Sequence, residues 1–430
     1  MGTPPLLGPK DTFNEIILGG LALFFLGAFL LLIVIGVNIF RFAIDLGIIF
    51  TLYLVVSLTL NLEAGYTGVP NFGKVMFVAG GAAVAGSVSG RLAALILAIN
   101  TQGNYNGNIA NIITQVNPPL SNNPLLSVEL LLLGVTLAAG VGAGLGFLAS
   151  YPAIRLREDY LGMLLLASAQ FFQIFLRGYE PLIGGTQGIE VPDLFAWPVK
   201  IITQGIAVPD LFAWPVKIIV IKVNVIGVRD MVVLGVLAIF AFLVYFYSER
   251  LARSPLGRTL RAVRDNEVAS RALGKDDVAI RRRVIVIASA ISGITGALLT
   301  FYIGSVGPET WTRITWTFWP WVIVIIGGAA NNLGVAVGAF SFTFLMRVID
   351  QVKFQFQPYL PIDVNWLQYL TFATLLILIL MFRPQGILPE RSSTTLPPPT
   401  VTMIMEQKVH LSEITSEKSQ NDSTSQEGID

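Results

Sequence analysis

The side chains that could do chemistry are few, and they do not form a familiar catalytic set. The chain has no cysteine and one histidine, His410, which lies in a polar segment near the C-terminus. This composition excludes thiol catalysis and disulfides, and it argues against a histidine-based metal site or catalytic triad. The dipeptide Gly-Lys occurs at 73–74 and 274–275, but Val75 and Asp276 follow where a phosphate-binding loop has serine or threonine. The sequence therefore shows no nucleotide site of its own.

Four carboxylates lie near the ends of apolar segments: Asp45, Glu63, Glu129 and Asp159. An ion-coupled transporter usually places ionisable groups near the middle of the membrane. None of the four is clearly there, which argues against ion-coupled transport. We interpret all four as residues at the membrane surface, in contact with water or lipid headgroups.

The stretch GYTGVPNFGKVMFVAGG at 65–81 interrupts two apolar segments with glycines and a proline. Irregular backbone at membrane depth is tolerated where it is buried in protein or lines a cavity. Its free carbonyl and N–H groups could face a polar solute, but an ordinary turn between helices would give the same pattern. The candidate residues for a translocation path are Gly65, Tyr66, Gly68, Pro70, Asn71 and Gly73.

The segment 249–283 is strongly basic. Its basic residues are Arg250, Arg253, Arg258, Arg261, Arg264, Arg271, Lys275, Arg281, Arg282 and Arg283. Its acidic residues are Glu249, Asp265, Glu267, Asp276 and Asp277. Short loops rich in arginine and lysine stay in the cytoplasm, so this segment is predicted to be cytoplasmic. Anchoring by positive charge alone would explain the composition without any particular order of residues.

The order of residues in this segment nevertheless indicates a docking surface. Asp265, Asn266 and Glu267 open a run of good helix formers that Gly274 closes, which predicts a cytoplasmic amphipathic helix. Small residues such as Ala269 stand between the charges and would allow a partner to approach closely.

The composition is that of a membrane protein. Of the 430 residues, 54% are hydrophobic and only 13% are charged, and the mean hydropathy is +0.70. Soluble proteins carry about 25% charged residues, so this chain predicts a polytopic protein in the lipid bilayer. The net charge of +1 gives no reason to expect nucleic acid as a partner.

The apolar segments predict an all-α transmembrane helical bundle of about ten membrane-spanning helices. The segments are approximately 16–39, 42–62, 72–97, 126–150, 160–177, 230–248, 284–303, 318–331, 332–349 and 366–383. Counting from the basic segment places both termini in the cytoplasm, although Arg41 then falls on the outer side. The predicted parts are a cytoplasmic N-terminal segment at 1–15, a transmembrane domain at 16–390 and a disordered cytoplasmic tail at 391–430.

A glycine-rich string, AGVGAGLGF at 139–147, resembles a dinucleotide fingerprint only superficially, because it lies inside an apolar segment. The pairs Gly140/Gly144 and Gly142/Gly146 instead predict close packing of helices.

Two long loops, 98–125 and 178–229, are predicted on the outer side. The second contains a tandem duplication, 186–202 followed by 203–219, which differs only at Glu190 and Ala207. The prolines of each copy predict extended or turn-rich structure rather than helix. A duplication tolerated by a surface loop is the simplest interpretation.

Two other interpretations of the duplication stay open: a pair of ligand-binding modules, and a docking surface. Such a surface would consist of Phe195, Trp197, Phe212 and Trp214.

At the basic segment the chain resembles a known family. RAVRDNEVASRALG at 261–274 is similar to the cytoplasmic coupling loop, or EAA motif, of LivM-type permeases of branched-chain amino acid ABC importers. The other similar stretches are GYTGVPNFGKVMF at 65–77, IRLREDYLGM at 154–163, GGTQGI at 184–189, ISGITGALL at 291–299, IGGAANNLGVAVGA at 326–339 and MFRPQGILPER at 381–391. They follow the family's order over about residues 42–391. The chain departs from the family at Lys74, where members often have histidine.

The resemblance implies a permease subunit in the plasma membrane that translocates branched-chain or related amino acids. Its implied partners are a LivH-like permease subunit, two cytoplasmic ABC ATPases and an extracytoplasmic substrate-binding protein. ATP and Mg would be used by the ATPases, so this chain is expected to bind no cofactor and to be no enzyme. The implied ATPase-coupling residues are Arg264, Asp265, Asn266, Glu267, Ala269, Leu273 and Gly274.

Other functions stay open. Similar permeases carry urea and short amides, and the sequence does not distinguish those substrates. A secondary transporter would need a coupling site in the membrane, and a membrane-bound enzyme would need convergent catalytic groups. The sequence shows neither. Within the duplication, only the first copy follows Gly184 and Gly185 and completes the family's GGTQGI pattern, so the second copy is the expected insertion.

Overall fold

The computed structural model describes residues 36–100, 104–156, 158–204, 227–356 and 365–390, together with Gly19, Gly27, Leu32 and Ile33. The chain divides into two units, Met1–Glu390 and Arg391–Asp430, and all described residues belong to the first. The predicted N-terminal segment 1–15, most of the segment 16–39 and the tail 391–430 therefore lie outside the described residues.

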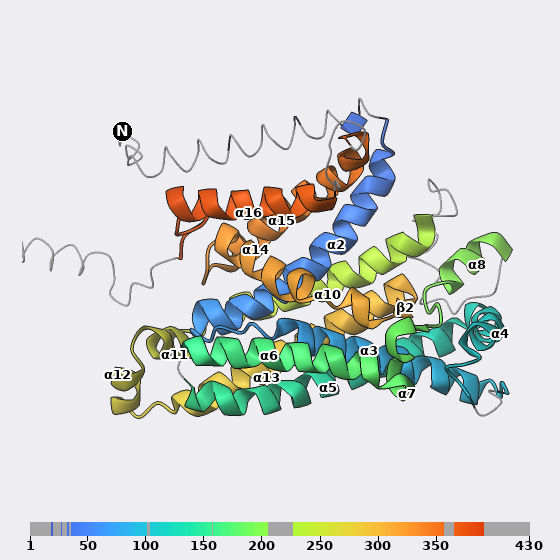
Figure 1. The fold of residues 1–430 in the computed structure, drawn as a ribbon, viewed down its shortest axis with the longest axis horizontal. Coiled ribbons are helices and arrows are strands. Elements are labelled where there is room, and N and C mark those ends of the chain that lie inside the picture. The colour runs from blue at the N-terminus through green and yellow to red at the C-terminus, as the bar shows by residue number, and fades with distance from the viewer. Residues whose placement is uncertain are drawn as a thin grey trace, which may run out of the picture. The chain divides into compact units, whose positions relative to one another are not determined.

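The described residues are almost wholly helical (Figure 1). The helices are α2 (Ile39–Leu60), α3 (Lys74–Ile96), α4 (Ile109–Asn122), α5 (Pro124–Arg155), α6 (Glu158–Gly178), α7 (Glu180–Ile183), α8 (Trp197–Gln204), α10 (Val228–Arg253), α11 (Pro255–Asp265), α12 (Glu267–Ala272), α13 (Asp277–Ile303), α14 (Trp319–Gly327), α15 (Asn332–Phe356) and α16 (Asn365–Phe382). The π-helices are η1 (Asn61–Tyr66) and η5 (Ile314–Phe318), and the 3₁₀ helices are η2 (Gly185–Gln187) and η4 (Pro308–Thr310). Two short strands, β1 (Ile189–Glu190) and β2 (Ser305–Val306), pair antiparallel.

Seven described helices are long and apolar enough to cross a membrane. They are Ile39–Tyr66, Lys74–Ile96, Pro124–Pro152, Tyr160–Gly178, Val228–Arg253, Asp277–Ile303 and Asn332–Lys353. Two shorter apolar helices, Ile314–Gly327 and Trp366–Phe382, fall at the predicted segments 318–331 and 366–383. The prediction of an all-α polytopic membrane protein is confirmed. The total of ten spans and the orientation of the termini stay predictions.

The spans differ in how much protein surrounds them. About three quarters of the apolar window is buried in α2, α3 and α13, at 72%, 78% and 72%. In α5, α6 and α10 the buried share is 28%. The first group therefore forms the centre of the bundle, and the second group presents apolar side chains outward, as helices in contact with lipid do.

Glycines set the closest approaches between the central helices. A Cβ atom added at Gly81 of α3 would lie 2.1 Å from the carbonyl oxygen of Gly293 in α13, and one at Gly296 would lie 1.9 Å from that of Val78. No side chain fits at such distances, so these backbones touch directly.

The packing prediction for 139–147 is right for one glycine pair and wrong for the other. Gly142 and Gly146 face Ser289 of α13, where a Cβ atom would lie about 2.5 Å away. Gly140 and Gly144 have open space beside them. Only Gly142 and Gly146 lie on the face of α5 that α13 covers.

The predicted loop 98–125 contains helix α4, which corrects the interpretation of this segment as a plain loop. Ile112, Val116 and Leu120 are buried and recur every four residues, so they form one apolar face. The asparagines and prolines between them obscured this periodicity.

The first copy of the duplication is partly helical, which is the second correction. Gly184 and Gly185 have φ angles of +73° and +60°, so the first copy is preceded by a turn that requires glycine. The prediction that the prolines exclude a helix is wrong for α8, because Pro198 stands in the first turn, where no backbone N–H is needed. The second copy lies outside the described residues from 205 onward.

Candidate functional site

The predicted translocation-path residues lie where α2 gives way to α3. The π-helix η1 ends α2, residues 67–73 are irregular, and α3 begins at Lys74. π-Helices are rare and are frequently found at functional sites. Tyr66 and Asn71 are only 2% and 1% exposed. Gly68 and Pro70 are partly buried. Most of the break is therefore enclosed by protein in this conformation.

Two glycines of the break are required by their surroundings. A Cβ atom at Gly65 would lie 2.2 Å from Oδ1 of Asn61 and 2.6 Å from the amide nitrogen of Ala330. Gly68 has a φ of +73°, and its Cα faces the side chain of Arg264. The break is thus held between the Asn-rich turn before α15 and helix α11.

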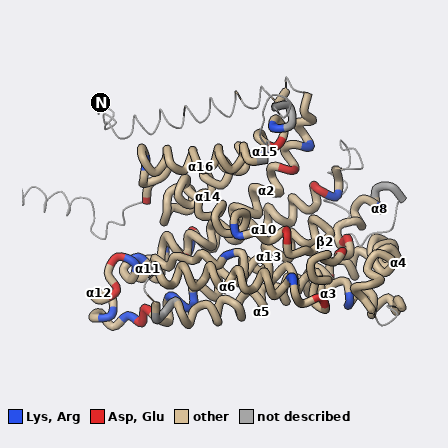
Figure 2. Tube along the Cα trace, viewed as in Figure 1, with Lys and Arg blue, Asp and Glu red and all other residues tan. Residues whose placement is uncertain are grey.

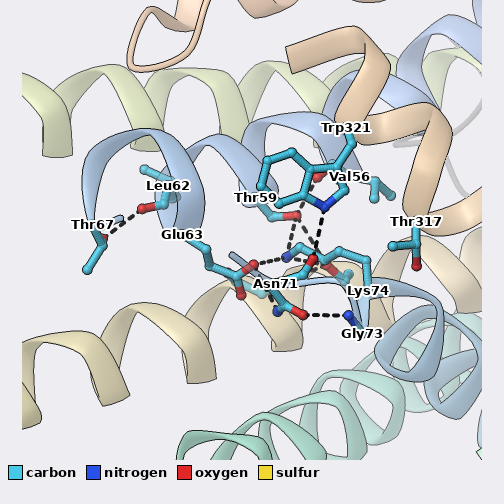
Figure 3. A network of polar contacts seen from close by, with 12 residues as sticks. Val56, Thr59, Leu62, Glu63, Thr67, Asn71, Gly73, Lys74, Thr317 and Trp321 are labelled. Carbon is cyan, nitrogen blue, oxygen red and sulfur yellow. Dashed lines mark hydrogen bonds and ion pairs between the residues drawn. The ribbon is translucent and has the colours of Figure 1, made fainter. Parts of the chain in front are cut away.

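A fully buried ion pair lies beside the break. The Nζ atom of Lys74 lies 2.8 Å from Oε2 of Glu63, and both side chains are 0% exposed. Asn71 donates to the same carboxylate oxygen at 3.0 Å (Figure 3). The other oxygen, Oε1, is buried and has no hydrogen-bond partner among the described residues.

Hydroxyl and backbone groups hold both charged side chains in place. Lys74 donates to Thr59 of α2 at 3.2 Å and to Ser292 of α13 at 3.5 Å. Asn71 accepts from the amide of Gly73 at 2.9 Å, and its carbonyl oxygen accepts from the indole of Trp321 at 3.2 Å. The network therefore joins α2, the break, α3, α13 and α14.

This pair corrects the interpretation of the carboxylates. Glu63 does not face water or headgroups, because α2, α3 and α13 enclose it. Glu129 is exposed, Asp45 is partly buried, and the side chain of Asp159 lies outside the described residues. A lysine at the start of the predicted segment 72–97 was the one signal in the sequence that could have indicated the pair.

A second polar chain runs from η1 toward the end of α10. Asn61 accepts from the amide of Ala330 at 2.8 Å and donates to Asn332 at 3.0 Å. Asn332 in turn donates to Glu249 at 3.1 Å. These bonds connect the family-like stretch 326–339 to both η1 and the first residue of the basic segment.

The predicted ATPase-coupling residues lie on two helices rather than one. Asn266 separates α11 from α12, with an extended φ of −156°, and its side chain accepts from the amide of Ala269 at 2.9 Å. Such a cap starts a new helix at Glu267. Gly274 has a φ of +73° and ends that helix, as predicted.

Helices α11 and α12, with the residue that follows α12, present charged and apolar side chains to solvent. Val268 and Leu273 are 77% and 79% exposed. Arg271 bonds to Asp277 at 2.7 Å, and this bond raises the pKa of the Arg271 guanidinium, so the pair stays charged. Charged residues crowd around α11 and α12, while most of the bundle is uncharged (Figure 2).

The structure brings one predicted coupling residue into contact with the predicted path. The guanidinium of Arg264 donates to the carbonyl oxygen of Gly65 at 2.7 Å and pairs with Glu390 at 3.0 Å. Its neighbour Arg261 lies 5.3 Å from the centre of the Tyr66 ring. Among the described residues, Asp265, Asn266, Ala269 and Leu273 form no hydrogen bond or ion pair with the break. The two predicted sets thus meet through α11.

These features define a class: a multi-pass membrane protein with a helix break enclosed in its core and a charged loop bonded to that break. The chain belongs to the family described as "Branched-chain amino acid transport system / permease component", whose model matches residues 42–380. It is therefore a permease component of the plasma membrane.

Curated relatives agree with the family. The "Probable branched-chain amino acid transport permease protein LivM" of Methanocaldococcus jannaschii is 35% identical over 359 residues, which are 83% of this chain and 95% of that protein. The "High-affinity branched-chain amino acid transport system permease protein LivM" of Salmonella typhimurium is 29% identical over 262 residues, 59% of this chain and 56% of that protein. The protein of the same name in Escherichia coli is 28% identical over the same length. No solved structure matches the chain.

Proposed function

We propose that the chain is one of two permease subunits of an ATP-driven ABC importer for branched-chain or related amino acids. A LivH-like subunit would complete the membrane domain, and an extracytoplasmic binding protein would deliver the amino acid. Two cytoplasmic ATPases would dock on α11 and α12 and would use ATP and Mg. This chain would contribute no catalytic group of its own.

The observation that carries the proposal is the contact of Arg264 with Gly65. It lets a movement of α11 reach the helix break directly, without passing through the rest of the bundle. Since Glu390 also pairs with Arg261 and Arg264, the break, the coupling helix and the end of the transmembrane domain would move as one unit. An ATPase that pulls on α11 would thus act on the candidate path.

The exposed side chains of α12 fit a protein partner. Val268 and Leu273 are apolar and stand among charged residues, so they would supply a small apolar centre with a polar rim. Glu267 is restrained by Arg271 and by Arg281, the latter at 3.3 Å. The surface is therefore ordered before a partner binds.

The test is reconstitution of the chain with its four proposed partner components in proteoliposomes. We expect uptake of labelled L-leucine that requires both ATP and the binding protein. Uptake of urea or a short amide in place of leucine would assign the alternative substrate class. Uptake driven by an ion gradient without ATP would contradict the ABC mechanism.

A further inference from the structure

The Glu63–Lys74 pair is unlike the other ion pairs of the described residues. Each of the others has at least one partly exposed side chain, whereas both members of this pair are fully buried. Moving two charges out of water costs several kcal/mol each, and apolar replacements of buried pairs are often neutral or stabilising. Stability alone therefore does not explain the pair, and ionisable residues within a membrane usually mark a functional site.

The charges of Glu63 and Lys74 are opposite to those of the α-ammonium and α-carboxylate groups of a free amino acid. A free amino acid with an uncharged side chain carries an ammonium and a carboxylate on the same α-carbon and has no net charge. If it enters between Glu63 and Lys74, one ion pair becomes two, and no net charge is added to the low-dielectric core. A neutral solute such as urea could hydrogen-bond to both groups, but it would bring no opposite charge to either of them.

Each charged group has support that would persist after the pair separates. Thr59 and Ser292 donate their own protons to the carbonyl oxygens of Val56 and Ala288, at 2.7 and 2.8 Å, so their oxygens accept from Lys74. The side-chain amide of Asn71 would still donate to Oε2 of Glu63. Oε1 of Glu63 has no partner among the described residues and is available to an incoming donor. Both ends are therefore preorganised for separate ligand groups.

The break provides a way to separate the two residues. Glu63 belongs to η1, two positions before Gly65, whose carbonyl oxygen accepts from Arg264. Lys74 begins α3 on the other side of the irregular stretch. The indole of Trp321, stacked on Phe72 with ring centres 4.8 Å apart, lies next to the pair and offers an apolar surface (Figure 3).

We propose that Glu63 and Lys74 bind the zwitterionic backbone group of the translocated amino acid, with Glu63 accepting from the ammonium and Lys74 donating to the carboxylate. The proposal rests on the function proposed above and adds the residues that recognise the substrate. The ion pair seen here is the closed form of this site.

The test uses the complete transporter in proteoliposomes and two readouts, L-leucine uptake and ATP hydrolysis stimulated by the binding protein. The double variant Glu63→Gln/Lys74→Met removes both charges with little change in volume. We expect stimulated hydrolysis to persist and leucine uptake to fall about tenfold or more, as for the loss of a charged hydrogen bond. The matched control, Asp350→Asn/Lys353→Met, neutralises an ion pair within α15 and should leave both readouts unchanged.

Unchanged uptake in the double variant would overturn the proposal, and so would equal loss of uptake and hydrolysis, which would indicate a purely structural pair. If the double variant does not insert, the charge-reversed variant Glu63→Lys/Lys74→Glu decides. It keeps a neutral pair but inverts the order of charges, so we expect it to insert and to transport leucine poorly. Wild-type uptake in that variant would overturn the proposal. If wild type itself takes up no leucine with its partners, the proposed function fails instead.

Discussion

The guanidinium of Arg264 donates a hydrogen bond to the carbonyl oxygen of Gly65 across a sequence separation of 199 residues. One partner lies on the charged helix α11, and the other lies in the π-helix at the end of α2. Gly65 accepts no bulkier residue, because Asn61 and Ala330 stand against its Cα. The contact therefore links the loop expected to meet the ATPases with the irregular backbone in the core.

Replacing Arg264 should uncouple transport. The variant Arg264→Met keeps the length of the side chain and loses the bonds to Gly65 and Glu390. A hydrogen bond from a charged group contributes about 1.5–3 kcal/mol, so we expect leucine uptake in proteoliposomes to fall by about tenfold or more. Arg258→Met on the same helix is the control, because Arg258 is exposed. Equal uptake in the two variants would show that the contact does not carry coupling.

Leu273, which directly follows α12, should be needed for docking of the ATPases. Leu273 is 79% exposed, so Leu273→Asp should not disturb folding, but it would place a charge in the apolar centre of the interface. We expect the ATPase subunits to co-purify poorly with this variant. Ala110→Asp, at an exposed residue of α4 in the predicted outer loop, is the control. Co-purification at wild-type levels with Leu273→Asp would show that the docking surface lies elsewhere.

Substitutions at Gly274 distinguish the effect of backbone conformation from the effect of side-chain size. Its φ is +73°, yet no atom lies within 4 Å of the position of an added Cβ. Asparagine tolerates this conformation and β-branched residues do not. We therefore expect Gly274→Asn to keep stimulated ATP hydrolysis and Gly274→Val to lose most of it. Comparable loss in both variants would show that a side chain at 274 obstructs the partner.

The spans were predictable because a helix that crosses lipid must be long and apolar, and this requirement leaves a direct trace in the sequence. The end of the coupling helix at Gly274 was predictable for a similar reason, since only a few residues adopt a positive φ. Helix α4 was missed because its apolar positions are diluted by asparagine and proline. The boundary between α11 and α12 at Asn266 was missed. An asparagine before a run of helix formers is typical of the start of a single helix, and the sequence does not show that another helix ends directly before it.

Lys74 at the start of an apolar segment was the one indication of the Glu63–Lys74 pair, but local sequence could not predict that the two side chains are buried together. Each residue stands at the end of an apolar segment, where a charge is ordinarily exposed. Only the packing of α13 against α2 and α3, which depends on glycines such as Gly81 and Gly293, encloses the two side chains. Burial of this kind is a property of the assembled bundle.

Residues 249–283 and residue 390 should lie on the same side of the membrane. Arg261 and Arg264 pair with Glu390 at 3.2 and 3.0 Å, and these contacts require that both segments lie on the same side. The pairing of β1 with β2 places residues 189–190 beside 305–306, at the other end of α13 (Figure 1). Reporter fusions after 225 and after 391 should therefore report outside and inside, respectively. A C-terminus found outside would contradict both this arrangement and the cytoplasmic assignment of the basic loop.

The second copy of the duplication, 203–219, should be dispensable, whereas the glycines before the first copy should not. Gly184 and Gly185 adopt left-handed conformations, and a Cβ atom at Gly184 would lie 2.5 Å from the carbonyl oxygen of Gly188. Ile201 and Ile202 occupy the equivalent positions before the second copy, and isoleucine is strongly disfavoured in that conformation. Only the first copy can therefore form this turn and present β1 to β2.

Two variants test this asymmetry by leucine uptake. Deleting 203–219 removes the last two residues of α8 and shortens the predicted outer loop. Loop-closure entropy changes slowly with length, so the cost should stay below about 1 kcal/mol and uptake should survive. Replacing Gly184 and Gly185 with isoleucine should cost about 1–2 kcal/mol per residue and should separate β1 from β2, so uptake should fall. Replacing Gly235, which has open space around it, with alanine provides the control. If the deletion abolishes uptake while the protein still inserts, the repeat has a function of its own.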